Sequence, residues 1–268
     1  MIDPVILILP DLHAREDRFY AEAVSEAVAK NIEIVCLGDY LDPYDEPDEF
    51  PGLRENGIWV PLWQLLELKR SRPHMTHLLL GNHDCSYLYD RNICPVRYNE
   101  ECADFSHEIF IENASQFSLF YDTTIAGKRF LISHAGVTRG WLYETGKESL
   151  DELLRWLRYS YMEFCLDNQK TLIWKYLAHI GAERGGKDKA GSIIWADFWE
   201  HVDKFNDLHD PGIIQIVGHT QLNFHPASIG TRLYCLDCRE PFYIDAYGII
   251  RSWKTDESIM EKYDIFNH

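Results

Sequence analysis

Residues 32–42 read IEIVCLGDYLD, an apolar run that leads into a glycine and then into two aspartates. Short apolar runs bounded by turn residues are typical of buried β-strands, and sites in α/β proteins form just past the strand ends. The stretch therefore predicts a buried strand that delivers Asp39 and Asp42 to a site at the edge of a sheet.

Four further stretches repeat this pattern. They read VILILPDLH at 5–13, HLLLGNHD at 77–84, FLISHAG at 130–136 and IIQIVGHT at 213–220. Each apolar run leads into Asp, Asn or His side chains, which are the ligand types of metal sites. One such cluster could arise by chance, but five of them predict one shared site.

The residues between these runs predict the rest of the fold. Apolar side chains at helical spacing predict helices at 16–30, 58–70 and 149–180, and shorter apolar runs predict strands. The strands are expected at 4–9, 32–37, 76–80, 118–125, 128–133, 213–217, 231–236 and 242–253. Strands that alternate with helices in this way indicate an α/β (α+β) fold.

The clusters extend from Asp11 to His219, so a domain boundary between them would split the site. A chain of 268 residues can bury a core as one larger domain. We therefore expect a single domain, 1–268, with a helical, lid-like insertion around 141–200. Residues 185–187 read GGK and superficially suggest a phosphate loop, but the strand before it and the GxxxxGK[ST] spacing are absent.

The charge balance limits the class of partner. The chain has 26 basic and 43 acidic residues, a net charge of -17, and this argues against a nucleic-acid-binding protein, which usually has a basic face. An anionic substrate would need a local positive centre in so acidic a protein. A pair of bound cations can supply that centre.

Cysteine usage and hydropathy indicate the compartment. The seven cysteines are irregularly spaced, and the N-terminus lacks the basic region and the long apolar region of a secretion signal. No stretch approaches the roughly 20 apolar residues that span a bilayer. We expect a reduced, cytoplasmic protein that binds neither membrane nor nucleic acid.

The clusters supply carboxylate, imidazole and amide groups but no thiolate, a set that suits hard or borderline divalent metals. The candidate ligands are Asp11, His13, Asp39, Asn82, His134 and His219. Asp11 and His13 are two residues apart in an extended segment, so both can point the same way, and Asp39 can bridge two ions. Two ions about 3.5–4 Å apart can clamp a phosphoryl group and polarise a bridging water into hydroxide.

The motifs DLH, GDYLD, GNHD, HAG and GHT, in this order, resemble those of the calcineurin-like metallophosphoesterase family. The similarity is greatest to its phosphoprotein-phosphatase branch, which includes serine/threonine phosphatases and symmetrical diadenosine tetraphosphatases. The resemblance covers the chain to about Thr220. It implies two mixed β-sheets packed as a sandwich and flanked by helices, with the site at the strand ends.

The resemblance also implies a role for each candidate. Asp11, His13 and Asp39 would hold one metal; Asp39, Asn82, His134 and His219 would hold the other. His83 would protonate the leaving oxygen, and Asp42 would orient its imidazole. The reaction implied is in-line attack on phosphorus by a metal-bridging hydroxide, without a covalent intermediate.

The chain departs from the family pattern at its phosphate clamp. Pro43 replaces the arginine of the family motif GDxxDR, and bidentate phosphate recognition is a typical arginine function. Arg15 and Arg139, which follow DLH and HAG, are candidates to bind the substrate instead. GNHD stands where GNHE is usual, and Gln221 follows Thr220 where many wider relatives have the last histidine of GHxH.

Three functions fit these features. The first is hydrolysis of phosphate monoesters, either phosphoproteins or small phosphorylated metabolites, with two divalent ions: manganese, iron, zinc, nickel or cobalt. The second is hydrolysis of dinucleoside polyphosphates or phosphodiesters. The third is a non-catalytic scaffold, which would predict eroded ligands, whereas here every ligand position holds a competent residue. The loss of the clamp arginine and the acidic residues at 42–49 favour smaller substrates over phosphoproteins.

Overall fold

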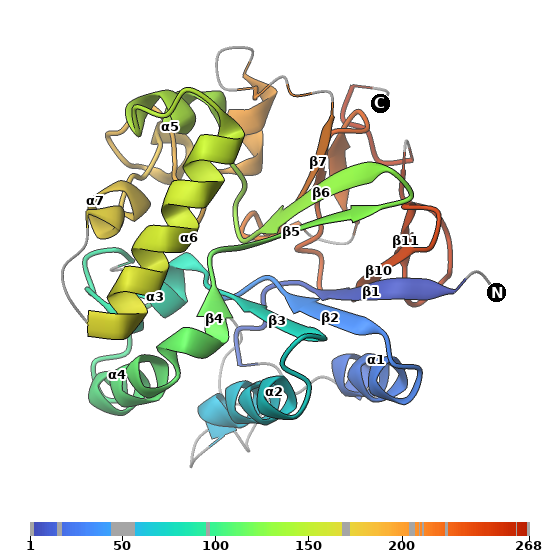
Figure 1. The fold of residues 1–268 in the computed structure, drawn as a ribbon, viewed down its shortest axis with the longest axis horizontal. Coiled ribbons are helices and arrows are strands. Elements are labelled where there is room, and N and C mark those ends of the chain that lie inside the picture. The colour runs from blue at the N-terminus through green and yellow to red at the C-terminus, as the bar shows by residue number, and fades with distance from the viewer. Residues whose placement is uncertain are drawn as a thin grey trace.

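The structure, a computed structural model, describes residues 3–14, 18–43, 57–94, 97–167, 172–203, 207–208, 210, 212–222, 225–260 and 262–266. These residues form two mixed β-sheets with helices around them (Figure 1). This architecture confirms the α/β fold of two packed mixed sheets that the sequence predicts.

The first sheet has the strand order β11-β10-β1-β2-β3-β4. Its strands are β1 (Pro4–Leu9), β2 (Glu33–Cys36), β3 (Thr76–Leu79), β4 (Phe117–Ser118), β10 (Phe242–Asp245) and β11 (Ile250–Ser252). β1 to β4 are parallel to one another, β10 is antiparallel to β1, and β11 is antiparallel to β10. The carboxyl ends of β1, β2 and β3 therefore lie along one edge of the sheet.

The second sheet has the order β5-β6-β7-β9-β8. Its strands are β5 (Phe120–Ile125), β6 (Lys128–Ser133), β7 (Ile213–Val217), β8 (Ala227–Ile229) and β9 (Leu233–Cys235). β6, β7 and β9 are parallel, whereas β5 and β8 are antiparallel to their neighbours at the two edges.

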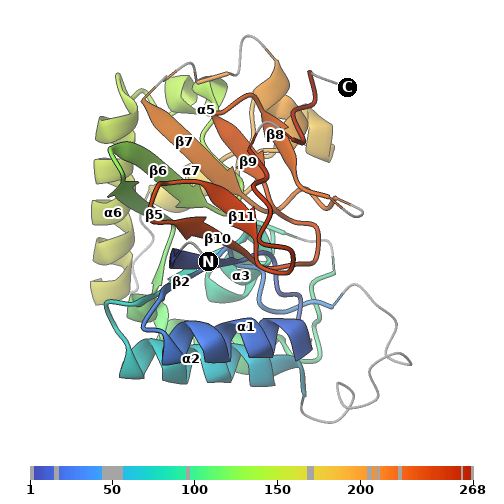
Figure 2. The same ribbon diagram turned by 90° about the vertical axis from the view of Figure 1, so that its right-hand side faces the viewer.

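Helices surround both sheets. They are α1 (Arg18–Ala29), α2 (Val60–Ser71), α3 (Asn82–Leu88), α4 (Ala103–Glu112), α5 (Arg139–Glu144), α6 (Leu150–Asp167) and α7 (Ile173–Leu177). Short 3-10 helices are η2 (Gly57–Trp59), η3 (Ala114–Gln116), η4 (Ala182–Arg184) and η5 (Phe198–Val202). Figures 1 and 2 show α1 and α2 side by side against the same face of the first sheet, while α5, α6 and α7 lie on the other side of the molecule.

Alternation along β1 explains why its apolar run is continuous. Leu7 and Leu9 face the core that contains Ala23 of α1 and Leu62 of α2. Ile6 and Ile8, whose side chains point to the other face of the sheet, contact a second core between the two sheets. That core comprises Ile6, Ile8, Val35, Leu37, Leu79, Phe130, Ile132, Ile216, Tyr234, Leu236, Phe242, Ile244 and Ile250, among others. Successive side chains of a strand point to opposite faces, so a strand covered on both faces is apolar throughout.

Two predicted strands are wrong in their extent. The strand expected at 118–125 is divided at Leu119, where the chain passes from β4 in the first sheet to β5 in the second. The strand expected at 242–253 is a hairpin of β10 and β11, and Gly248 with φ +67° lies in its turn. A run of strand-forming residues does not by itself show where a chain changes sheets.

β8 was not predicted, since only three residues of the edge strand pair with β9. Within the described part of the chain, no helix is both long and apolar enough to cross a bilayer.

Candidate functional site

The predicted ligands converge where both sheets present strand ends. Asp11 lies just past β1, Asp39 past β2, and Asn82 begins α3 directly after β3. From the second sheet, His134 follows β6 and His219 follows β7. All six candidates, His13 included, are buried, with at most 6% of each residue exposed.

The side chains form two groups that could each hold a metal ion. One group is Asp11, His13 and Asp39, and the other is Asp39, His134 and His219. In each group the candidate ligand atoms lie within 4.8 Å of one another. Asp39 belongs to both groups, as expected of a bridging carboxylate.

In the second group, the Nε2 atom of His134 lies close to three other possible metal-ligand atoms. His134 Nδ1 donates to the carbonyl oxygen of Leu37 at 2.9 Å, and burial lowers the pKa of this imidazole, so Nε2 carries no proton. Nε2 lies 3.0 Å from Asn82 Oδ1, 3.1 Å from His219 Nδ1 and 3.4 Å from Asp39 Oδ2. Ligands that share a metal at about 2.0–2.2 Å have comparable separations from one another, so these residues fit a cation.

The first group has the same character. His13 Nδ1 lies 2.9 Å from the carbonyl oxygen of Asp42, which leaves Nε2 facing Asp39 Oδ2 at 3.7 Å. Burial lowers the pKa of His13 to about 3, so the imidazole is neutral and can act as a ligand. Asp11 Oδ1 has no hydrogen-bond partner among the described residues, although Oδ2 accepts from the His219 N–H at 2.9 Å.

Asp11 also gives an electrostatic indication of a cation. Burial, together with the nearby carboxylates of Asp237 and Asp39, raises its pKa well above the usual value. A buried carboxylate beside other carboxylates is unfavourable unless a positive charge compensates it. The donor set therefore fits a pair of divalent ions better than it fits a metal-free polar core.

Backbone strain is concentrated in the same place. His13, Asp39, Asp42 and His219 have φ values of 46°, 50°, 61° and 63°. Left-handed conformations are unfavourable for residues with a Cβ and persist where the surrounding structure imposes them. The turns that follow the strands thus hold these residues in backbone conformations of unfavourable free energy.

Two glycines allow the close approach of the turns. A Cβ at Gly81 would lie 2.0 Å from Asp39 Oδ1, and a Cβ at Gly218 would lie 2.1 Å from Asp11 Oδ1. Both glycines are accordingly required by the space that the carboxylates occupy.

His83 lies beside the metal groups in a hydrogen-bonded chain. Its Nδ1 is 2.8 Å from Asp42 Oδ2, and Asp42 Oδ1 accepts from the Tyr87 hydroxyl at 2.6 Å. Burial lowers the pKa of His83, but the charge of Asp39 and the hydrogen bond to Asp42 outweigh it and raise the pKa well above the usual value. This raised pKa favours the protonated form of the imidazole, which a proton donor needs.

Asp84 supports the turn that carries Asp39, a role that the sequence did not indicate. Its buried carboxylate accepts from the backbone N–H groups of Asp39, Tyr40 and Gly81 at 2.7, 2.9 and 2.8 Å. It thereby fixes the turn after β2 to the start of α3. An aspartate in the first turn of a helix after a glycine is a recognisable capping signal, but its contact with a turn 44 or 45 residues earlier needs the fold.

Arg184 is a second residue that the sequence did not indicate. It ends η4, within the segment expected as an insertion. Nη2 donates to the His219 carbonyl oxygen at 2.9 Å and to Thr220 Oγ1 at 3.1 Å, and Nε lies 2.6 Å from Asp197 Oδ2. This guanidinium therefore contacts the turn that carries the candidate ligand His219.

The two arginines that the sequence suggests for substrate binding are Arg15 and Arg139. Arg15 lies outside the described residues. Arg139 is exposed at the start of α5, and no contact of its side chain with the clustered ligands is seen among the described residues.

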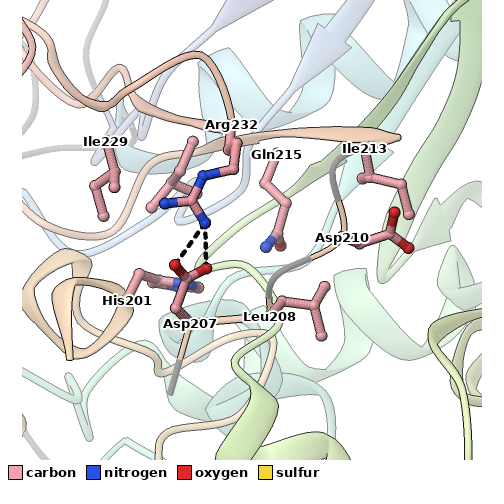
Figure 3. A pocket seen from close by; sticks show the side chains of 9 residues that line it. His201, Asp207, Leu208, Asp210, Ile213, Gln215, Ile229 and Arg232 are labelled. Atoms are coloured by element: carbon pink, nitrogen blue, oxygen red, sulfur yellow. Dashed lines mark hydrogen bonds and ion pairs between the residues drawn. The ribbon is translucent and has the colours of Figure 1, made fainter. Parts of the chain in front are cut away.

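A separate cavity lies near the start of β7 and is shown in Figure 3. Its volume is about 20 Å³, and the Arg232 guanidinium forms an ion pair with Asp207 inside it (Figure 3). His201 and Gln215 line the same cavity, and their polar atoms bond to the backbone of Ala135 and Val137. Its arginine is already paired with Asp207, and none of the candidate ligands lines it.

The sequence matches the calcineurin-like phosphoesterase family over residues 4–223. The chain belongs to this family. It is accordingly a hydrolase of phosphate esters, and the matched region includes every one of the clustered ligands. Among curated protein sequences, none matches this chain.

Solved structures with TM-scores above 0.5 share the fold. A cold-active protein-tyrosine phosphatase from a psychrophilic Shewanella species superposes with a TM-score of 0.58 at 14% identity. The match covers 96% of this chain and 80% of that one. A serine/threonine phosphatase from Saccharomyces cerevisiae gives a TM-score of 0.47 at 12% identity, covering 91% of this chain and 74% of that one.

Proposed function

We propose that this chain is a dimetal phosphoesterase that hydrolyses phosphate monoesters, on phosphoproteins or on small phosphorylated metabolites. One observation carries the proposal: imidazole and carboxylate groups converge at the strand ends, and His83, bonded to Asp42, lies beside them. The family membership and the phosphatase activity named for the Shewanella structure agree with it.

Asp11, His13 and Asp39 would hold one ion, and Asp39, Asn82, His134 and His219 would hold the other. The family's two divalent ions would supply an activated water and neutralise the charge of the phosphoryl group. Manganese is the metal we would test first, and iron, zinc, nickel and cobalt suit the same oxygen and nitrogen ligands.

The chain's own residues perform the remaining tasks. His83 donates the proton of one ring nitrogen to the leaving oxygen, while its other nitrogen, Nδ1, stays bonded to Asp42. Asp42 is held in turn by the Tyr87 hydroxyl, which fixes the direction in which the imidazole points. Asp84 holds the turn that carries Asp39, so the ligands are positioned before any substrate arrives.

The seven cysteines are all free thiols in the structure, which supports a reducing compartment such as the cytoplasm. We also propose that residues 141–200 act as a lid-like insertion of a single domain. The helices α6 and α7 and the turn that carries Arg184 belong to this segment.

The test is hydrolysis of p-nitrophenyl phosphate and bis-p-nitrophenyl phosphate, measured side by side with added Mn²⁺ and then with EDTA. We expect an EDTA-sensitive preference for the monoester. A preference for the diester would instead favour the phosphodiester or dinucleoside polyphosphate function. Metal-bound protein without turnover of either compound would contradict both and favour a scaffold.

A control excludes a contaminating phosphatase. The variant Asp39→Asn, purified in parallel, should be inactive on both compounds, because Asp39 contributes to both metal groups. Activity that persists in this variant would not belong to the proposed site.

A further inference from the structure

We infer that Arg184 binds the phosphoryl group of the substrate and replaces the arginine that is missing at Pro43. The inference rests on the proposed function, since it names a substrate contact of the same site. Arg184 lies outside the segment that corresponds to the motif GDxxDR, and it is neither Arg15 nor Arg139, the two arginines that the sequence suggests.

The position of the guanidinium supports this inference. Arg184 Nη2 bonds to the backbone of His219 and to the side chain of Thr220, the next residue. The guanidinium therefore lies against the turn that carries a candidate ligand.

The N–H donors that the contacts of Arg184 leave unused also support the inference. A guanidinium has five N–H donors in a rigid fork, and it is always charged in proteins. The contacts to His219, Thr220 and Asp197 engage Nη2 and Nε, and none of them engages Nη1. The side chain is 27% exposed at a site whose ligands are buried. Nη1 thus remains available for phosphate oxygens, which guanidinium groups recognise well.

The contacts and the turn that hold Arg184 in place support the inference further. Asp197 anchors Nε from the loop before η5, and Thr220 Oγ1 also accepts from the Phe198 N–H at 2.8 Å. Gly185, with φ +77°, ends η4 directly after the arginine. A Cβ at Gly186 would meet the Ile180 carbonyl oxygen at 1.9 Å, so the second glycine is also required by the turn. The GGK segment that lacks phosphate-loop spacing thus shapes the turn that presents Arg184.

A specificity follows from the added charge. A phosphate monoester carries about 1.5 to 2 negative charges at neutral pH, whereas a diester carries a single charge and has one fewer non-bridging oxygen. A guanidinium that bonds to non-bridging oxygens therefore favours the monoester. Arg184 would set the preference between these two substrate classes.

The test measures orthophosphate binding by the Mn²⁺-loaded full chain with isothermal titration calorimetry, and so does not depend on turnover. Arg184→Gln should weaken phosphate binding about tenfold or more, as expected for loss of charged hydrogen bonds. It should leave the bound metal content unchanged. Arg129→Gln is the matched control, because Arg129 is similarly exposed at 31%, pairs with Asp122 and lies near the start of β6, at the opposite end of that strand from His134. We expect wild-type phosphate affinity for it.

Kinetics provide a second measurement on the same proteins. Arg184→Gln should lower kcat/KM for p-nitrophenyl phosphate by a larger factor than for bis-p-nitrophenyl phosphate. A purely structural role, such as support of the His219 turn, would lower both by the same factor and would reduce the metal content. If Arg184→Gln fails to fold, Arg184→Lys decides, because it keeps the charge, loses the fork and should still weaken phosphate binding.

The outcomes separate this inference from the proposed function. Equal phosphate affinity in wild type and Arg184→Gln, or no phosphate binding by metal-loaded wild type, would overturn the role of Arg184. Wild-type protein that shows no EDTA-sensitive turnover would instead overturn the proposed function, whatever its phosphate affinity.

Discussion

Asn82 and His83 are neighbours in the chain whose side chains point to different partners. Asn82 Oδ1 faces His134, while the imidazole of His83 points to Asp42. The peptide between them belongs to the first turn of α3, and successive helical side chains diverge in direction. A candidate ligand and a candidate proton donor can thus be adjacent in the sequence and still have separate partners.

This separation predicts the behaviour of His83→Asn. The variant should keep its metal, because the ligand atoms are untouched, and lose turnover where the leaving oxygen needs a proton. We expect a decrease in kcat of about 10²–10⁴-fold on an alkyl phosphate, the usual contribution of general acid catalysis, and a smaller decrease on p-nitrophenyl phosphate. Metal content by atomic emission and kcat on both substrates check this. Full activity on the alkyl phosphate would show that His83 is not the acid.

Tyr87 should act through Asp42. In Tyr87→Phe the Asp42 carboxylate loses the hydrogen bond at 2.6 Å and can rotate away from His83. Removal of such an outer contact typically lowers activity about 10–100-fold, and we expect the loss to be larger for the alkyl phosphate than for p-nitrophenyl phosphate. The control is Tyr243→Phe, which removes another Tyr–Asp hydrogen bond, to Asp256, outside the site. Equal losses on both substrates would contradict a role through His83.

The convergence of the candidate ligands could be predicted from sequence because each one follows its own strand at a short distance. Asp84, Tyr87 and Arg184 could not, because what defines them is a partner far away in the chain. Tyr87 meets Asp42 across 45 residues, and Arg184 meets His219 across 35. Local spacing carries no information on such contacts.

At the scale of elements, strand ends were predicted better than strand pairing. The run at 213–217 coincides with β7, and the run at 128–133 coincides with β6. Pairing depends on contacts with residues far away in the chain. Leu119, where the chain changes sheets, packs in the first core, and Ile229 of the short β8 packs in a third, smaller core with Leu233 and Cys235 of β9. The spacing of residues within a strand does not reveal these contacts, so both features were missed.

One polar contact joins elements of different sheets. Glu33 in β2 bonds to His77 in β3 at 2.9 Å and to the Tyr121 hydroxyl in β5 at 2.8 Å. Burial raises the pKa of Glu33, but these hydrogen bonds outweigh it and lower the pKa below its usual value of 4.5. The carboxylate therefore stabilises the fold above the unfolded pKa, and this contribution is lost as the pH falls through the lower, folded pKa.

Glu33→Gln should accordingly decrease the free energy of unfolding by about 1–2 kcal/mol at neutral pH, the range for a charged hydrogen bond. The difference from wild type should shrink as the pH falls below 4.5. Urea denaturation at a series of pH values measures it. Glu26→Gln is the control, since Glu26 is 46% exposed in its ion pair with Lys30 and should change little. A difference that grows toward low pH would contradict the assignment.

At the scale of the whole molecule, the site is where the two sheets are connected. The first sheet contributes Asp11, Asp39 and Asn82, and the second contributes His134 and His219. An ion bound by Asp39, Asn82, His134 and His219 would link the sheets directly. A net charge of -17 adds self-repulsion that bound cations reduce.

Metal removal should therefore destabilise the fold as well as abolish activity. Metal at about 100 times its Kd stabilises the folded state by about 2.7 kcal/mol, so we expect EDTA to lower Tm by about 5 °C or more. Asp39→Asn should lose bound metal, activity and this Tm shift together. Asp245→Asn changes another buried aspartate, which pairs with Arg251 and lies opposite Pro4 at the start of β1. It should lower Tm yet keep the EDTA-dependent shift, whereas equal Tm values for wild type with Mn²⁺ and with EDTA would show that no metal links the sheets.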